Sequence, residues 1–364
     1  MADEHKTDQN PEELENLSPE ELQERIQEEK KNAKRSLRFA FTALLAIIAV
    51  CIAWFVANNR VSMTGTQISA DNDRPFELAS VGERLTDEEE YLKDADGNDI
   101  LSAGTEEKYS KYIDINTGEE VSGEKIYHTG SSGLAWYMNS EESLIPGAGD
   151  ELEFYLIPKK SGLTKVEISV DLDGYTFETT KKISKNTDSK IADLLNGHIL
   201  FFRYLDATYG YHGWLGADRK ITLNAPKQTV DGKTVTEFQK DVPYRVTLRW
   251  KWPKYLRNYI YTDRSYGDLF TAAMKTDTDK KEEYDKLIEF VVDQLNTDIT
   301  TKDEDKKNKL FYDSQSATNS APNPKISAAD ISTTLLDTYS SYYNQADEYI
   351  GTNIQYVYIQ INVD

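Results

Sequence analysis

An acidic segment has the residue types and the spacing of a metal-binding loop. Asp94, Asp96 and Asp99 lie on either side of Gly97, and carboxylates at alternating positions around a glycine are typical of calcium loops. The glycine comes earlier than in an EF-hand, and Thr105 stands where that loop has its bidentate glutamate. A hairpin turn built on Asp96 and Gly97 would explain the same residues. The segment therefore predicts either a calcium site, with calcium as the sole candidate cofactor, or a turn.

A second group of candidate side chains is aromatic. Tyr209, Tyr211, His212 and Trp214 follow one another among glycines, and such rings can stack on a sugar or form part of a partner-binding surface. The chain has 23 tyrosines, so packing at the edge of a sheet is the alternative explanation. These four residues are the binding hypothesis that the sequence supports.

The histidines give little support for catalytic chemistry. There are 4 of them, and none forms a His-Glu-x-x-His sequence or lies four residues from another, the spacing that lets one helix face bind zinc. The chain also has no Cys-x-x-Cys and no glycine-rich nucleotide loop. We therefore predict no catalytic residues and no enzymatic activity, and expect structural roles for His198 and His212. The other two histidines are His5 and His128.

Six basic residues stand out in an acidic chain. With 63 acidic and 42 basic residues the formal net charge is −21, which disfavours binding to nucleic-acid phosphates. The six bases can pair with carboxylates internally or meet the acidic face of another copy. They are Arg245, Arg249, Lys251, Lys254, Arg257 and Arg264.

An apolar segment and its flanking charges predict on which side of a membrane these residues lie. Residues 39–57 carry no charge, and about 20 apolar residues are enough to span the hydrocarbon core as a helix. Five bases precede the segment and only Arg60 follows closely, a bias that places the preceding side in the cytoplasm. The prediction is a single-pass protein of the cell membrane with an acidic helical cytoplasmic tail, residues 1–38, and an extracellular region, residues 58–364. The five bases are Lys30, Lys31, Lys34, Arg35 and Arg38.

The same segment also has features of a cleaved export signal. Cys51 and Ala53 provide small residues for cleavage before Trp54, which would release the extracellular region. An apolar core longer than about 7–15 residues and a long leader favour an uncleaved signal-anchor. Because Cys51 is the only cysteine, the extracellular region has no disulfides, which suits bacterial secretion.

The extracellular region predicts an antiparallel β-sandwich with inserted helices. Apolar residues at helical spacing predict helices near 281–296 and 327–350, the second beginning with Ser327 as a cap. Residues 164–172 alternate strictly, and Asp173-Gly174 then predicts a hairpin turn. The last strand is apolar on both faces, so we expect it to be central. The expected strands are 61–68, 76–79, 151–157, 164–172, 175–178, 198–204, 220–223, 244–252 and 354–363.

Four segments of the chain are similar to those of a known group of proteins. Residues 53–62 combine the alanine at the end of an apolar run, aromatic residues and the start of a Val-Ser-x-Thr-Gly strand; the others are 196–202, 246–253 and 343–351. On these segments the chain resembles the camelysin/TasA-like proteins that Gram-positive bacteria export. The resemblance implies a jelly-roll-like sandwich and a role at the cell surface or in the biofilm matrix.

For function, the sequence predicts a cell-surface β-sandwich that acts by structure, assembly or binding. Its partners would be the membrane, other surface proteins, or further copies joined by strand addition through residues 61–68, with no nucleic acid. The resemblance implies one alternative, a camelysin-like metal-dependent peptidase. The other alternative is a sensor whose cytoplasmic tail reports ligand binding outside.

Overall fold

The computed structural model describes residues 63–64, 75–80, 106–131, 133–139, 145–179, 182–299, 307–314 and 325–363. The chain divides into two compact units, residues 1–60 and 61–364, and all the described residues belong to the second. The acidic tail, the apolar segment 39–57 and the acidic loop 94–99 therefore lie outside the described residues. Within the described ranges, no helix is both long and apolar enough to cross a bilayer.

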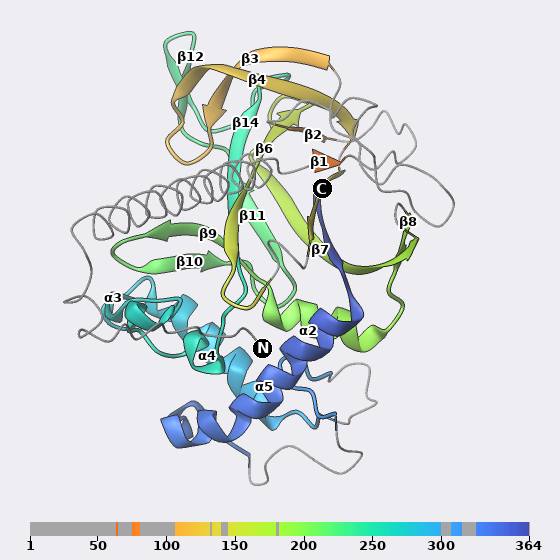
Figure 1. Ribbon diagram of the computed structural model, residues 1–364. Coiled ribbons are helices and arrows are strands. Elements are labelled where there is room, and N and C mark those ends of the chain that lie inside the picture. The colour runs from red at the N-terminus through yellow and green to blue at the C-terminus, as the bar shows by residue number, and fades with distance from the viewer. Residues whose placement is uncertain are drawn as a thin grey trace, which may run out of the picture. The chain divides into compact units, whose positions relative to one another are not determined.

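The described residues are mainly β, in two mainly antiparallel sheets (Figure 1). In the first sheet, β15 pairs with β5 on one side and β7 on the other, the central position that its two apolar faces predict. Among the described strands, β1 lies at the edge, where Met63 and Thr64 pair with β5. The order is β1 (Met63–Thr64), β5 (Gly133–Asn139), β15 (Tyr356–Val363), β7 (Lys165–Thr179) and β11 (Lys220–Asn224), with β8 (Lys182–Lys185) paired to β7.

Part of the second sheet closes on itself. β14 pairs with β3 through its first residues and with β9 through its last, while its other edge pairs with β6 along the full length. Since β3, β4, β2 and β6 pair in turn, these four strands and β14 form a closed ring. The order is β10 (Gly210–Trp214), β9 (Leu200–Asp206), β14 (Tyr244–Lys251), β3 (Glu106–Asp114), β4 (Glu120–Ser131), β2 (Phe76–Ser80) and β6 (Gly149–Pro158), and β12 (Gln228–Val230) and β13 (Lys233–Val235) form a separate hairpin.

Alternating side chains build one core from both sheets. Along β14, buried residues from Tyr244 to Trp250 alternate with half-buried ones, and along β7 the residues from Val166 to Leu172 do the same on the predicted face. These side chains join a single hydrophobic cluster together with Trp252. A smaller cluster of Ala79, Tyr112, Ile126, Tyr155 and Ile157 comes from the strands of the ring.

The predicted hairpin turn at Asp173-Gly174 is wrong. β7 continues through both residues to Thr179, and Gly174 lies opposite Val357 of the central strand. A Cβ on Gly174 would lie 2.7 Å from Cγ2 of Ile354, closer than packed carbon atoms approach. Because Gly174 has no side chain, Ile354 can pack closely against this strand. The glycine does not mark a reversal of the chain.

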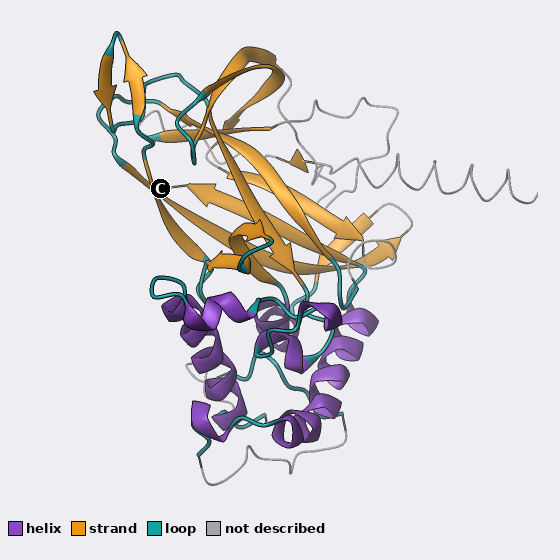
Figure 2. Cartoon of the chain, turned by 90° about the vertical axis from the view of Figure 1, so that its left-hand side faces the viewer, coloured by secondary structure: helices purple, strands orange, loops and turns teal. Residues whose placement is uncertain are grey.

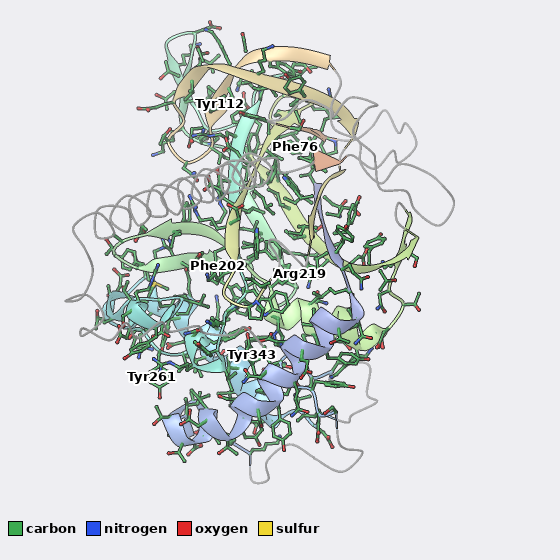
Figure 3. The ribbon with its side chains drawn as sticks, in the orientation of Figure 1. Phe76, Tyr112, Phe202, Arg219, Tyr261 and Tyr343 are labelled. Atoms are coloured by element: carbon green, nitrogen blue, oxygen red, sulfur yellow. The ribbon has the colours of Figure 1, made fainter. Side chains whose placement is uncertain are left out.

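The helices lie together at one end of the sheets (Figure 2). Side chains from α4, α5 and η2 form a second hydrophobic cluster, to which β9 contributes Phe202. Figure 3 shows Phe202 and Tyr343 where the second sheet meets these helices. The helices are α2 (Ser189–His198), η2 (Leu256–Tyr259), η3 (Arg264–Tyr266), α3 (Ala272–Thr276), α4 (Lys281–Asn296), η4 (Ala328–Asp330) and α5 (Thr333–Asn353).

The helices agree only partly with the sequence pattern. α4 covers the range that its periodicity predicts. Ser327 forms the expected capping box with Asp330. This box caps the short η4, however, and the long helix α5 that follows is capped by Ser332. The strand expected at 198–204 begins two residues later, because His198 ends α2, a helix that begins at the cap residue Asp188.

Candidate functional site

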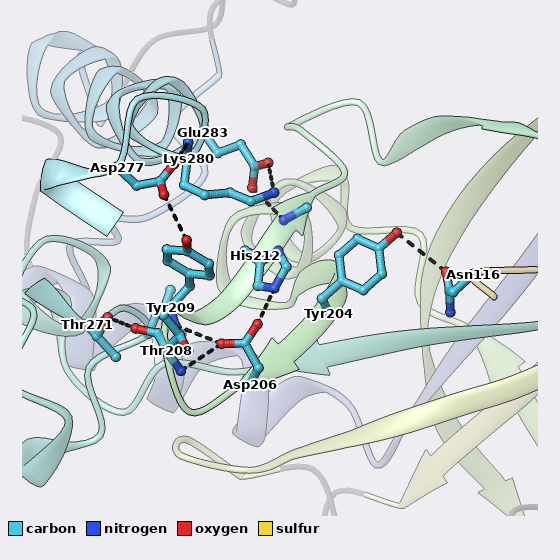
Figure 4. A network of polar contacts seen from close by, with 12 residues as sticks. Asn116, Tyr204, Asp206, Thr208, Tyr209, His212, Thr271, Asp277, Lys280 and Glu283 are labelled. Atoms are coloured by element: carbon cyan, nitrogen blue, oxygen red, sulfur yellow. Dashed lines mark hydrogen bonds and ion pairs between the residues drawn. The ribbon is translucent and has the colours of Figure 1, made fainter. Parts of the chain in front are cut away.

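The β9–β10 hairpin positions the predicted aromatic residues at the edge of the second sheet. Its antiparallel register places His212 opposite Tyr204 and Trp214 opposite Phe202. The turn is held by Asp206, whose Oδ1 accepts the backbone N–H groups of Thr208 and Tyr209, each at 2.8 Å. Figure 4 shows the resulting polar network on this hairpin.

The four predicted residues do not form one platform. Tyr211 packs against Phe202 with ring centroids 5.2 Å apart, and Trp214 packs against Phe290 of α4 at 5.7 Å. Both rings therefore contribute to the hydrophobic cluster at the helices. The structure brings together only the other two: the edge of Tyr209 meets the ring of His212 at 5.7 Å.

His212 is the most unusual polar group of the hairpin. Its Nε2 lies 2.8 Å from Oδ2 of Asp206, and since the carboxylate accepts, Nε2 donates. The ring stacks on Tyr204 with centroids 4.8 Å apart. The residue is 8% exposed, and Nδ1 is buried with no hydrogen-bond partner among the described residues. An unsatisfied buried ring nitrogen costs stability, so it marks a position with a possible role beyond packing.

Two carboxyls of this network have a lowered pKa, Asp206 and Asp277. Burial raises the pKa of Asp206, but the N–H of Tyr209 and the hydrogen bond from His212 outweigh it and lower the pKa below its ordinary value. The hydroxyl of Tyr209 donates to Asp277 at 2.8 Å and lowers the pKa of that carboxyl. Glu283 accepts the N–H of Gly213 at 2.6 Å. The pair of His212 and Asp206 can hold a proton at Nε2, but neither ring nitrogen hydrogen-bonds a described hydroxyl or thiol that it would activate.

Beside the pair lies a buried arginine that the sequence did not single out. Arg203 donates to the carbonyl of Thr247 and to Oδ1 of Asn116, both at 2.7 Å, and the hydroxyl of Tyr204 donates to the same Asn116 oxygen at 3.4 Å. Burial lowers the pKa of Arg203. One feature of the sequence could have indicated this arginine. It is a charged residue within the apolar run that begins at Leu200, and charged residues are unusual in buried strands.

His198 belongs to the core. It is fully buried, its Nδ1 lies 2.7 Å from Oδ1 of Asp347, and its Nε2 lies 3.1 Å from the carbonyl of Leu310. Both ring nitrogens are therefore engaged by oxygen atoms of the core. The ring stacks on Tyr343 at 4.4 Å, and Trp252 donates to the same Asp347 oxygen at 2.8 Å. These contacts tie α2 and α5 to the end of β14.

The helices also enclose a pocket of about 330 Å³. Ile260, Ile288 and Ile331 provide apolar walls, and Lys275 lies at the pocket with its Nζ 5.3 Å from the ring centre of Tyr284. The hydroxyl of Tyr284 donates a hydrogen bond to the carbonyl of Ile260 at 2.6 Å. The volume is at the lower end for a small-molecule site.

The metal hypothesis gains no residues from the structure. Asp94, Asp96 and Asp99, the calcium candidates, lie outside the described residues. In the part of the chain that is described, no three side chains of His, Cys, Asp or Glu come close enough to hold a metal ion.

No protein-family model matches this chain, and no curated protein or solved structure is significantly similar to it.

Proposed function

We propose that the two sheets form a jelly roll. Eight strands, taken in chain order as β5, β6, β7, β9, β10, β11, β14 and β15, support this. A jelly roll places its first, eighth, third and sixth strands in one sheet and its second, seventh, fourth and fifth in the other. The orders β5-β15-β7-β11 and β6-β14-β9-β10 follow this pattern, with antiparallel neighbours throughout.

On this scaffold the protein acts by binding at the cell surface, and the gathering of its exposed apolar side chains carries that proposal. Large hydrophobic side chains exposed singly are ordinary, but neighbouring ones mark interaction sites, and tyrosine is favoured in such sites. Among the described residues the exposed large hydrophobic side chains fall into three segments, around 145, on β9 and between 255 and 266. They are Ile145, Tyr204, Leu205, Tyr255 and Tyr266.

Residues that neighbour these segments in the sequence are linked by backbone hydrogen bonds. The hairpin turn after β9 packs on residues 269–271: the N–H of Tyr211 donates to the carbonyl of Leu269, and the N–H of Thr271 donates to that of Tyr209. Near 145, Gly147 donates its N–H to the carbonyl of Trp252, just before Tyr255. These contacts bring the β9–β10 hairpin next to the stretch that follows Tyr266, and residue 147 next to the stretch that precedes Tyr255.

The geometry of the histidines favours binding over catalysis. His198 has both nitrogens engaged inside the core. His212 shares its proton with Asp206, without a described nucleophile beside it. A peptidase would need a metal or an activated nucleophile at such a pair.

A binding array tests this proposal. The full chain, held in nanodiscs of phosphatidylcholine, is applied to immobilised glycans and peptides. We expect at least one class to be retained, and retention to fall when Tyr255 and Tyr266 are replaced by alanine together. The matched control is Thr234→Ala on the exposed β13. Retention that is equal in the tyrosine variant and the control, or no retention at all, would contradict the proposal.

Assembly is a second candidate function, supported by the edge position of β1. Its two residues pair with Trp136 and Ala135 of β5, and strands at sheet edges can pair with a strand of another chain.

A further inference from the structure

Four of the six basic residues that stand out in the sequence are not neutralised by carboxylates. Arg245 pairs with Asp114 at 3.0 Å, and Arg249 pairs with Glu151 at 2.7 Å. The other four have no carboxylate within ion-pair distance among the described residues. They are Lys251, Lys254, Arg257 and Arg264, and we call them, with Tyr255 and Tyr266, the basic–aromatic surface.

The four cations are neighbours. Burial, together with the nearby charge of Arg264, lowers the pKa of Lys251, which places the two groups within electrostatic reach. Lys251 donates to the carbonyl of Gly147, and a Cβ on Gly147 would lie 3.5 Å from Cβ of Lys254. Arg257 reaches Tyr266, two residues after Arg264, with 4.5 Å between its guanidinium carbon and the ring centre.

Tyrosine rings alternate with these charges. Nζ of Lys254 lies 5.4 Å from the ring centre of Tyr255. The guanidinium of Arg264 lies 5.8 Å from the ring centre of Tyr211, the hairpin residue that the sequence singled out. Tyr255 and Tyr266 are 44% and 59% exposed, so their rings are accessible beside the cations.

The carboxylates on the same stretch leave an excess of positive charge. Residues 251–268 carry four bases and two acids, a net charge of +2 in a chain of net charge −21. Asp263 accepts from the hydroxyl of Ser265 at 2.7 Å, and Asp268 is buried and accepts from Asn258 at 2.7 Å.

We propose that the basic–aromatic surface binds an anionic polysaccharide. The inference rests on the proposed binding function and names its ligand class. Sugar rings stack on tyrosine faces, and carboxylate or sulfate groups match the donors of guanidinium and ammonium. Screening within about 8 Å at physiological salt lets this local charge act despite the acidic remainder of the chain.

The test compares three polymers on the full chain in phosphatidylcholine nanodiscs. The probes are polygalacturonate, dextran sulfate and neutral dextran, measured by biolayer interferometry at increasing NaCl. We expect both anionic polymers to bind and neutral dextran not to bind, with affinity falling as salt rises. A preference for one polymer identifies carboxylate or sulfate as the recognised group.

Matched variants locate the site. Lys254→Ala with Arg264→Ala should weaken binding about tenfold or more, since charge-assisted hydrogen bonds are the strong ones. Lys227→Ala with Lys233→Ala removes the same charge from exposed positions elsewhere and should change affinity less than about twofold. An equal loss in both pairs would overturn the proposal.

Two other results separate this inference from the proposed function. If the array of glycans and peptides shows retention that depends on Tyr255 and Tyr266, but neither anionic polymer binds, the ligand class is wrong and the binding function stands. Salt-dependent self-association that is lost in the Lys254 and Arg264 variant, without polymer binding, would assign the surface to a second copy instead.

Discussion

Gly174 and Gly351 both lie inside regular elements, but their surroundings predict opposite effects of an added methyl group. At Gly174 a Cβ would lie 2.7 Å from Cγ2 of Ile354 and 3.2 Å from Cγ2 of Ile191, whereas a Cβ at Gly351 would point into open space, with no atom within 4 Å apart from the neighbouring backbone of its own helix. Gly174→Ala should therefore lower the free energy of unfolding by about 1–3 kcal/mol. Gly351→Ala, in α5, should raise it by about 0.5–1 kcal/mol because alanine favours the helix.

Urea unfolding followed by tryptophan fluorescence measures both variants of the full chain. The two glycines control for each other, since each variant adds the same atom. An equal effect of both substitutions would show that β7 does not pass as closely to Ile354 as described.

The charge of Asp114 should contribute stability that depends on pH. Burial raises the pKa of this carboxyl. Hydrogen bonds from the N–H of Asn116 and from Arg245 lower the pKa by more than burial raises it, so the pKa lies below the ordinary 3.8. A carboxyl with a lowered pKa stabilises the fold above its ordinary pKa, and the contribution is lost as the pH falls below that value. Asp114→Asn should therefore cost about 1 kcal/mol or less at pH 7, and the deficit should vanish in acid.

The measurement is the urea midpoint of both proteins from pH 7 to pH 3. Lys111→Gln, which removes one charge of an exposed pair with Glu120, serves as the control and should show a smaller deficit. A deficit for Asp114→Asn that stays constant through this range would contradict the electrostatic account.

At the scale of elements, β1 is the strand whose removal tests assembly. Among the described residues it pairs with β5 through Met63 and Thr64. We expect a chain that starts at Trp54 to associate by strand addition and a chain that starts at Ser69, which lacks β1, to remain monomeric. Size-exclusion chromatography with light scattering at high concentration measures both.

Two monomers in that comparison would make strand addition wrong and leave binding as the better proposal. Chains formed equally by both lengths would place the contact elsewhere. Mixing the shorter chain with the longer one then tests whether β5 accepts a strand from a neighbour.

Elements with strong local patterns could be predicted from the sequence, and elements set by distant contacts could not. α4 shows its buried residues Leu287, Val291 and Leu295 at helical spacing. α2 was missed because its ten residues carry too few apolar positions to stand out beside the following strand. At Gly174 the local pattern of a turn was overridden by packing against Ile354.

The candidate site was predicted only where its residues are close in sequence. His212 and Tyr209 were singled out, and they do meet. Asn116, from the turn after β3, and Glu283, from α4, reach the same hairpin from far along the chain, and no local pattern indicates such contacts. Likewise, the division of the six bases into paired and unpaired depends on where β3 and β6 place their acids, Asp114 and Glu151.

At the scale of the whole molecule, the charge bias around residues 39–57 predicts its orientation. Protease added to intact cells should remove an epitope tag placed after Asp364 and spare a tag before Met1, because five bases precede the apolar segment and only Arg60 follows closely. The same tag on a known cytoplasmic protein serves as the control for cell lysis. Loss of the amino-terminal tag alone would reverse the orientation.

Metal removal tests the calcium hypothesis at the same scale. We expect EDTA to shift the melting temperature of the full chain by less than about 2 °C, since the acidic segment is equally explained by a turn. Asp96→Ala should then behave as a turn variant with the same response to EDTA. A large loss of stability that calcium restores would instead establish Asp94, Asp96 and Asp99 as ligands.

The central place of β15 has a consequence for how this protein is made. A ribosome delivers the chain from its amino end, so residues 356–363 emerge after every other described strand. Until then β5 and β7 have no strand between them, and the first sheet consists of two halves with bare inner edges. The first sheet must therefore remain open until β15 arrives, a state that a chaperone or protease can recognise.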